Sequence, residues 1–200
     1  MSCSICDRIP ASLVAVTGRD ESLPADVDLL RRHKDRYGAL GTEVDLWECP
    51  ECGLFYIFTT ETAFTGSGAG DADTLDRLTR EQSDVVHAML SCTGDPVAIQ
   101  EAVFALPAIA FAESLSAAYR NDRDFVALFT PRLVHEYAKR GQHSYGSHPT
   151  RDVLHSLVET QPTYAREVLA ATTSLPAELR ANLGDLEQRC HRNLGIPVAR

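Results

Sequence analysis

The chain has 200 residues, of which 44% are hydrophobic and 24% are charged, and its formal net charge is -9. This composition is that of an ordinary globular protein, and the length suits one large domain or two small ones. The negative charge disfavours nucleic acid and anionic lipid as partners, because both repel an acidic surface, and it favours a basic protein partner.

No run of about 18 apolar residues is present, as a membrane-spanning helix would need. The longest apolar stretch, residues 102–112, is interrupted by Pro107. The first ten residues, MSCSICDRIP, lack the basic and then apolar layout of a secretory signal. We therefore expect a cytoplasmic protein. Thiols stay reduced in that compartment, so Cys-x-x-Cys spacing there indicates metal or redox chemistry before disulfides.

Residues 1–64 are predicted to form a small β unit that contains one helix. Three segments have the apolar, aromatic or β-branched content of strands, namely 11–16, 43–48 and 54–60. The segment 24–38 lies between the first two of them. It begins with a proline and ends with Gly38, which is the punctuation of a short helix.

The glycine-rich segment 65–72 is predicted to be a linker, and residues 73–200 are predicted to be entirely helical. Asp73 is expected to cap the first helix of this second domain. Further helices are predicted at 95–106, 107–120, 122–140, 149–160, 162–173 and 176–193. Most of these begin at or near a proline, which favours antiparallel helices joined by tight turns. The expected fold class is α+β, mainly α.

Two Cys-x-x-Cys pairs, Cys3 with Cys6 and Cys49 with Cys52, offer four thiolates to one ion. Cysteine sulfurs bind zinc in a tetrahedron about 2.3 Å from the ion, and four of them leave no open position for a catalytic water. We predict one structural Zn²⁺ ion at these four residues and no catalytic residue. The alternative is a thiol-disulfide couple, but such a couple uses one motif at the start of a helix.

The second pair lies in the sequence CPECG, residues 49–53, which resembles the knuckle of zinc-ribbon and rubredoxin-like proteins. In such knuckles proline stiffens the loop, and glycine permits a backbone conformation in which N–H groups point at the sulfurs. The resemblance implies a zinc-ribbon-like fold for residues 1–64. The first pair departs from the pattern, because Asp7 stands at the place of the glycine.

Two looser resemblances concern the whole chain. The helical part resembles HEAT-like or armadillo-like helix pairs, although no fixed repeat is present and a plain bundle is equally consistent with the sequence. The knuckle and aromatic strand that lead to an acidic loop are similar to the layout of small bacterial proteins, which include immunity proteins against toxins. This resemblance implies an immunity or adaptor role.

Four histidines, His135, His143, His148 and His155, support a second hypothesis. A hydrolase-type enzyme would use His143 or His148 as a general base, with Glu136 or Asp152 as its acidic partner. His135 and Glu136 lack the second histidine, four residues on, that a zinc-protease helix requires. A third hypothesis, a nucleic-acid-binding regulator, depends on the basic segment 31-RRHKDR-36.

The sequence favours a zinc-stabilised cytoplasmic protein-interaction module over the other two hypotheses. A closed metal site, an acidic surface and proline-marked helices all agree with a protein that binds a basic protein partner rather than one that catalyses a reaction. The sequence does not identify the partner or the oligomeric state.

Overall fold

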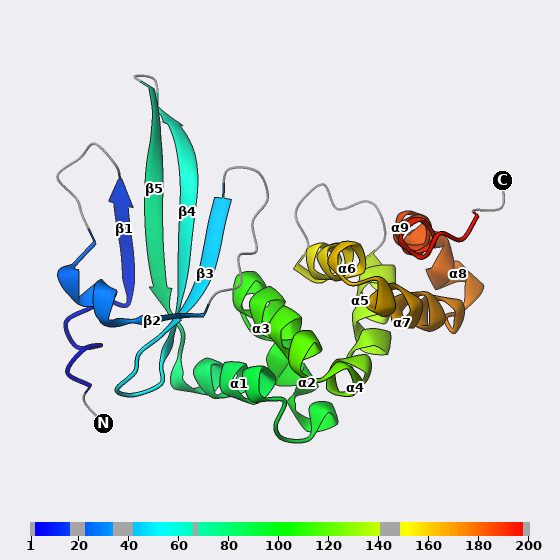
Figure 1. Cartoon of the computed structure of the whole chain (residues 1–200), viewed down its shortest axis with the longest axis horizontal. Coiled ribbons are helices and arrows are strands. Elements are labelled where there is room, and N and C mark those ends of the chain that lie inside the picture. The colour runs from blue at the N-terminus through cyan, green and yellow to red at the C-terminus, as the bar shows by residue number, and fades with distance from the viewer. Residues whose placement is uncertain (1–2, 17–22, 34–41, 66–67, 141–148, 198–200) are drawn as a thin grey trace. The chain divides into compact units, whose positions relative to one another are not determined.

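The computed structural model describes residues 3–16, 23–33, 42–65, 68–140 and 149–197 (Figure 1). The chain divides into two compact units, Met1–Ala88 and Met89–Arg200. The described part of the first unit contains a sheet, and that of the second is helical, so the predicted α+β class with a majority of helix is confirmed. None of the described helices combines the length and the apolar character that a membrane crossing requires.

The sheet of the first unit has five strands in the order β1-β5-β4-β3-β2, and all neighbours are antiparallel. Their bounds are Ser12–Val16 for β1, Arg31–His33 for β2, Thr42–Glu48 for β3, Phe55–Thr65 for β4 and Gly68–Arg77 for β5. The three strands predicted from the sequence are β1, β3 and β4. Their apolar and β-branched side chains suit a pleated, half-buried surface.

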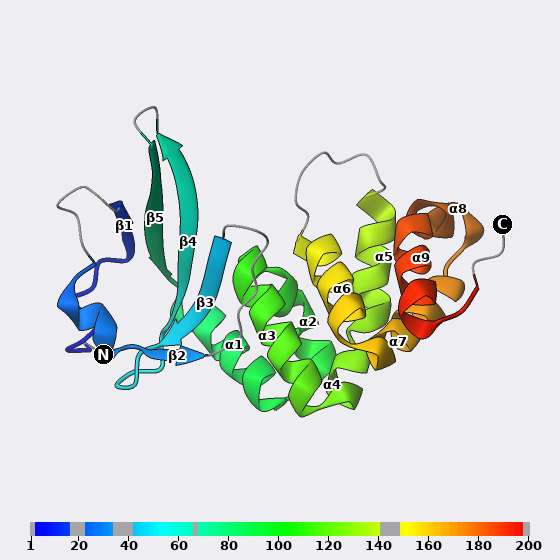
Figure 2. The same cartoon turned by 45° about the horizontal axis from the view of Figure 1, so that its top comes forward.

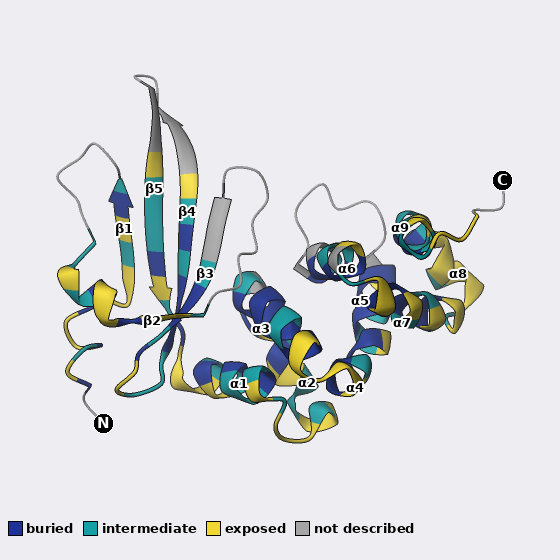
Figure 3. Cartoon of the chain, viewed as in Figure 1, coloured by how far each residue is buried: buried dark blue, intermediate teal, exposed yellow. Residues whose placement is uncertain are grey.

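Side chains of the sheet alternate between two faces, as the period of a β-strand requires. Trp47 lies opposite Tyr56 in the pairing of β3 with β4, and both side chains are buried in one core with Leu75 and the cysteines. Phe55 and Ile57 point to the other face and are also buried. Figure 3 shows the buried part of β4 at the end where that strand begins.

The helix predicted at 24–38 is wrong in the described part of that segment. Residues Ala25–Leu29 form a short 3-10 helix, η1, and Arg31–His33 form β2, which pairs with β3. Pro24 does begin the helical turn, but Leu30 is extended and buried. Burial of Leu30 and the hydrogen bonds to β3 outweigh the local preference for helix, which is a weak determinant of structure.

The described residues of the predicted linker, 65 and 68–72, and the expected helix cap Asp73 lie instead in strands β4 and β5. Gly68–Arg77 pairs with β4 along its whole length, and Asp73 accepts a hydrogen bond from the Thr60 hydroxyl at 2.7 Å. Helix α1 begins later and spans Arg80–Ser91. Thr79 and Gln82 form a reciprocal capping box at its start, with bonds of 2.9 and 3.2 Å.

The second unit consists of short helices that pack α3 against α6, α5 and α6 against α7, and α7 against α9 (Figure 2). Their bounds are Pro96–Phe104 for α2, Ala108–Asn121 for α3, Arg123–Ala127 for α4, Thr130–Arg140 for α5, Pro149–Thr160 for α6, Pro162–Thr173 for α7, Ala177–Arg180 for α8, Ala181–Leu183 for η2 and Gly184–Leu194 for α9. Each of the predicted helices at 95–106, 107–120, 149–160 and 162–173 is therefore present.

Two predicted helices are interrupted. The helix expected at 122–140 is α4 followed by α5, because Pro131 has no N–H to continue the hydrogen-bond ladder and its ring collides with the preceding turn. The helix expected at 176–193 is α8, η2 and α9, with the break at Gly184, a residue that destabilises helix interiors.

Candidate metal centre

The first cysteine pair lies in a turn that precedes β1. The N–H of Asp7 donates to the carbonyl oxygen of Cys3 at 2.9 Å, and the N–H of Arg8 donates to that of Ile5 at 3.1 Å. The backbone N–H of Cys6 lies 3.5 Å from the Cys3 sulfur. This segment, residues 3–8, is called the first knuckle below.

The second cysteine pair lies in a tight turn between β3 and β4, residues 49–54, called the second knuckle below. The N–H of Cys49 donates to the carbonyl oxygen of Leu54, and that of Gly53 donates to Cys49, both at 2.8 Å. Gly53 has φ +70°, a left-handed conformation that glycine adopts without steric penalty. This is the role that the CPECG pattern assigns to its glycine.

The four cysteine sulfurs of the two knuckles converge. Cys3 Sγ lies 3.5 Å from Cys49 Sγ, and Cys6 Sγ lies 3.4 Å from Cys52 Sγ. All four sulfurs lie within 4.8 Å of one another, and each belongs to a free cysteine. Sulfurs about 2.3 Å from a tetrahedrally coordinated ion would be about 3.8 Å apart, so the set fits one metal ion of the zinc type. Cys3, Cys6 and Cys49 are buried.

The surroundings act differently on the thiols. Burial raises the pKa of Cys3 and of Cys6 above the ordinary value for a thiol. Burial also acts to raise the pKa of Cys52, but the Leu54 backbone N–H and the neighbouring thiols act against it, and the pKa is lowered. Metal binding requires all four groups to be thiolates, so an ion here would displace protons that burial otherwise retains.

Glu51 ties the two knuckles together. Its carboxylate, on the second knuckle, accepts the Ser4 hydroxyl at 2.7 Å and the backbone N–H groups of Ser4 and Ile5 at 3.3 Å each. These bonds lower the pKa of Glu51, the bond from the Ser4 hydroxyl most of all. A carboxylate from one knuckle thus binds the first turn of the other.

Two arginines from the β5 end and the start of α1 bind carbonyl groups of the cysteines. Arg77 Nη1 donates to the carbonyl oxygen of Cys6 at 3.0 Å, and Arg80 Nη1 donates to that of Cys52 at 2.8 Å. Such outer contacts orient metal ligands. Sequence analysis missed both residues, because neither belongs to a cysteine motif.

Helix α1 also binds the second knuckle further along its length. The backbone N–H of Phe55 donates to the Ser83 hydroxyl at 3.0 Å, and His87 Nε2 lies 2.9 Å from the carbonyl oxygen of Gly53. Arg80, Ser83 and His87 occupy positions i, i+3 and i+7, which share one face of a helix. One helix face therefore fixes the backbone that follows Cys52.

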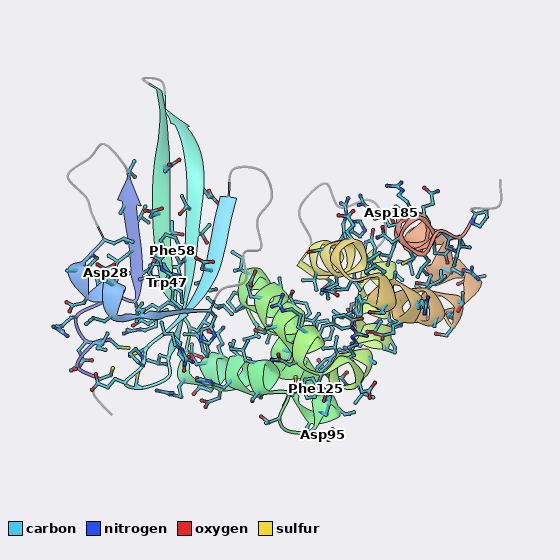
Figure 4. All side chains as sticks on the ribbon, in the orientation of Figure 1. Asp28, Trp47, Phe58, Asp95, Phe125 and Asp185 are labelled. Atoms are coloured by element: carbon cyan, nitrogen blue, oxygen red, sulfur yellow. The ribbon has the colours of Figure 1, made fainter. Side chains whose placement is uncertain are left out.

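The aromatic strand and Trp47 pack in the core with the cysteines. The ring of Trp47 stacks on that of Phe58 at a centroid distance of 4.5 Å (Figure 4). The Arg32 guanidinium lies 4.4 Å from the Trp47 ring, in a cation–π contact. Tyr56 is fully buried in the same cluster.

A pocket of about 990 Å³ opens beside the sulfurs. Its lining includes Cys3, Cys6 and Cys52 together with Glu51, Arg77 and Arg80. Cys52 is the partly exposed member of the four, so the pocket gives an ion a path to the site.

A second polar cluster surrounds Glu48, the residue before the second knuckle. His33 Nε2 lies 2.7 Å from its carboxylate, Arg31 pairs with the same oxygen, and His87 Nε2 lies 3.8 Å from the other. Burial acts to raise the pKa of Glu48, but the bonds from His33 and Arg31 outweigh it and lower the pKa. Two members of the predicted basic segment, Arg31 and Arg32, are thus engaged by Glu48 and Trp47, and residues 34–36 lie outside the described part.

The histidines of the enzyme hypothesis do not form a described site. His143 and His148 lie outside the described residues, as does the side chain of Asp152, and Glu136 pairs with Arg132 at 3.1 Å. His155 Nε2 lies 3.6 Å from the Asp185 carboxylate, but burial lowers the pKa of His155 to about 4. A base this weak contributes little near neutral pH.

Comparison with family models, with curated proteins and with solved structures finds no match for this chain. The class of the protein therefore follows from its fold and its candidate metal centre alone. It is an α+β protein whose sheet-containing unit gathers four cysteines from two knuckles into one candidate metal centre.

Proposed function

We propose that the chain is a zinc-stabilised protein-interaction module of the cytoplasm. Cys3, Cys6, Cys49 and Cys52 would hold one structural Zn²⁺ ion. The observation that carries the proposal is the convergence of two cysteine pairs, 46 residues apart in sequence, into one set of sulfurs within 4.8 Å. Four thiolates complete the coordination of zinc, so the ion would supply stability rather than an open catalytic position.

The energetic role of the ion follows from the burial of the thiols. Three of the four thiols are buried in the core of the first unit, where water cannot solvate them and only a metal ion would bond all of them at once. Structural zinc sites supply a large part of the folding free energy of small units. We infer that the first unit is zinc-ribbon-like in this sense, with an ion closing its core. The second unit would present helix pairs of the HEAT-like or bundle type.

The acidity of the chain supports a basic protein as the partner. The net charge of -9 raises the association rate with a positively charged surface and lowers it with nucleic acid. Immunity and adaptor proteins act by binding another protein, and an acidic surface suits such a role where the partner is basic. Binding that depends on charge weakens as salt screens it.

Metal analysis of protein purified without chelator tests the first half of the proposal. We expect one zinc per chain, and loss of metal from the Cys49→Ser variant but not from Cys92→Ser, since Cys92 lies outside the cluster. Less than half an equivalent of metal in the unaltered protein would overturn the zinc centre. Iron in place of zinc would overturn the identity of the ion.

Affinity capture of the tagged, zinc-loaded protein tests the second half. One stoichiometric basic protein, retained at low salt, released at high salt and absent with Cys49→Ser, is the expected result. Cys92→Ser should retain the partner. Capture of nucleic acid, or of no partner under any condition, would contradict the interaction module and direct attention to substrates of the histidine region.

A further inference from the structure

Tyr56 carries a buried polar group that the candidate metal centre explains. Its side chain is 0% exposed and lies in the same core as Cys3, Cys6 and Cys49. Its hydroxyl oxygen is buried, and among the described residues it has no hydrogen-bond partner within bonding distance. Buried hydroxyl groups in folded proteins are almost always bonded, so this one calls for an explanation.

The sheet places the Tyr56 hydroxyl next to Cys6. Tyr56 lies opposite Arg77 in the pairing of β4 with β5, and Arg77 Nη1 binds the carbonyl oxygen of Cys6 at 3.0 Å. Burial raises the pKa of Tyr56, the Cys6 thiol raises it further, and Arg77 acts to lower it. The hydroxyl in turn acts to lower the pKa of Cys6. The unpartnered group therefore faces a sulfur of the candidate centre.

The chemistry of sulfur decides what this hydroxyl can do. A neutral thiol is a weak acceptor, whereas the thiolate that ligates a metal is negatively charged and accepts a strong, charge-assisted hydrogen bond. Resting on the proposed zinc centre, we propose that Tyr56 is a positioning residue whose hydroxyl donates a hydrogen bond to the Cys6 thiolate in the metal-bound state. A bond to the thiolate is stronger than one to the neutral thiol, so it stabilises the metal-bound state selectively.

The Tyr56→Phe variant tests the proposal, with Tyr119→Phe as the matched control. Tyr119 is also buried, but its hydroxyl lies 2.7 Å from Thr163 in the helical unit. Zn²⁺ and Co²⁺ affinities are measured by competition with a chromophoric chelator. Tyr56→Phe should weaken both by about tenfold or more, as loss of an outer-shell hydrogen bond does, while Tyr119→Phe leaves them unchanged.

The cobalt-loaded proteins separate this role from simple packing. A hydrogen bond to a ligating thiolate stabilises the sulfur lone pair and raises the energy of the sulfur-to-cobalt charge-transfer band, so Tyr56→Phe should shift that band to longer wavelength. A band at the same wavelength in Tyr56→Phe and in the original protein would make Tyr56 a packing residue and overturn the proposal. Unchanged metal affinity in Tyr56→Phe would also overturn it.

A second probe does not depend on removing the hydroxyl. Replacement of Tyr56 by 3-fluorotyrosine keeps the ring shape and makes the hydroxyl a better donor, so metal affinity should rise, and unchanged or weaker affinity would contradict the hydrogen bond. Failure of the zinc centre itself has a different signature. In that case the unaltered protein would show no cobalt–thiolate absorption, whereas failure of the Tyr56 role leaves that absorption intact.

Discussion

The imidazole of His87 and the carbonyl group of Gly53 connect helix α1 to the second knuckle, with His87 Nε2 2.9 Å from the Gly53 oxygen. The same nitrogen would lie 3.0 Å from a Cβ atom built on Gly53, closer than real Cβ contacts normally come. Gly53 is therefore constrained twice, by its left-handed backbone and by the helix that packs on it.

Gly53→Ala should destabilise the first unit by about 2 kcal/mol, since a side chain in the left-handed region costs about 1–2 kcal/mol and the contact with His87 adds to it. Trp47, the single tryptophan, lies in the metal core, so its fluorescence during urea unfolding reports on this unit. Gly94→Ala, in the second unit and followed by far-UV circular dichroism, is the control, because Gly94 has φ +90° but nothing lies within 4 Å of its added Cβ. Equal effects at both positions would show that His87 contributes nothing.

Removal of one ligand should abolish the folded state of the metal core. Cys49→Ser leaves three thiolates in a buried site, and Cys49 itself is 0% exposed. We expect the metal content to fall below half an equivalent, and the Trp47 fluorescence to shift to that of an exposed indole. Addition of a strong chelator to the unaltered protein should give the same shift. A native spectrum in metal-free protein would contradict a stabilising role for the ion.

Glu48→Gln should destabilise the first unit by about 1–2 kcal/mol, because its hydrogen bonds to His33 and Arg31 lose their charge-assisted character. The pKa of Glu48 is lowered below the ordinary 4.5, so its contribution is present above that pH and is lost as the pH falls. Asp28→Asn, at an exposed position of η1, should have little effect.

A double-mutant cycle with His33→Gln checks the Glu48 prediction. The two changes should be less than additive in urea unfolding monitored by Trp47 fluorescence, since they remove the same 2.7 Å contact. Strict additivity would mean that the pair does not interact.

His155 should make the helical unit less stable between about pH 6.5 and pH 4. Burial lowers its pKa from 6.5 to about 4, so the unfolded chain takes up a proton over this range while the folded chain does not. Stability is fully present above pH 6.5 and falls toward pH 4 by on the order of 3 kcal/mol. Urea unfolding followed by far-UV circular dichroism measures this slope.

Two variants separate the contribution of His155 from other titrations. His155→Gln should remove most of the slope, whereas Asp185→Asn should retain it, because the Asp185 carboxylate 3.6 Å away acts to raise the pKa of His155. Trp47 fluorescence in the same samples reveals any loss of metal at low pH. An unchanged slope in His155→Gln would assign the pH dependence elsewhere.

Much of the fold was predictable where local signals are strong. The strands at 11–16, 43–48 and 54–60 and the helices at 149–160 and 162–173 were identified from side-chain type and proline position. The capping box of Thr79 and Gln82 was also visible in the sequence and marks the true start of α1. Because Thr79 is the cap, the helix begins at Arg80 and not at Asp73.

The sequence by itself determined which residues could hold a metal, because paired Cys-x-x-Cys spacing specifies the ligands through the chemistry of sulfur. Only the tertiary structure decided that β2 and β5 are strands and that Glu51, Tyr56, Arg77, Arg80 and His87 surround the cysteines. These contacts join residues far apart in the chain. Their stability comes from burial and from hydrogen bonds between different elements. A local pattern of side chains does not predict such contacts.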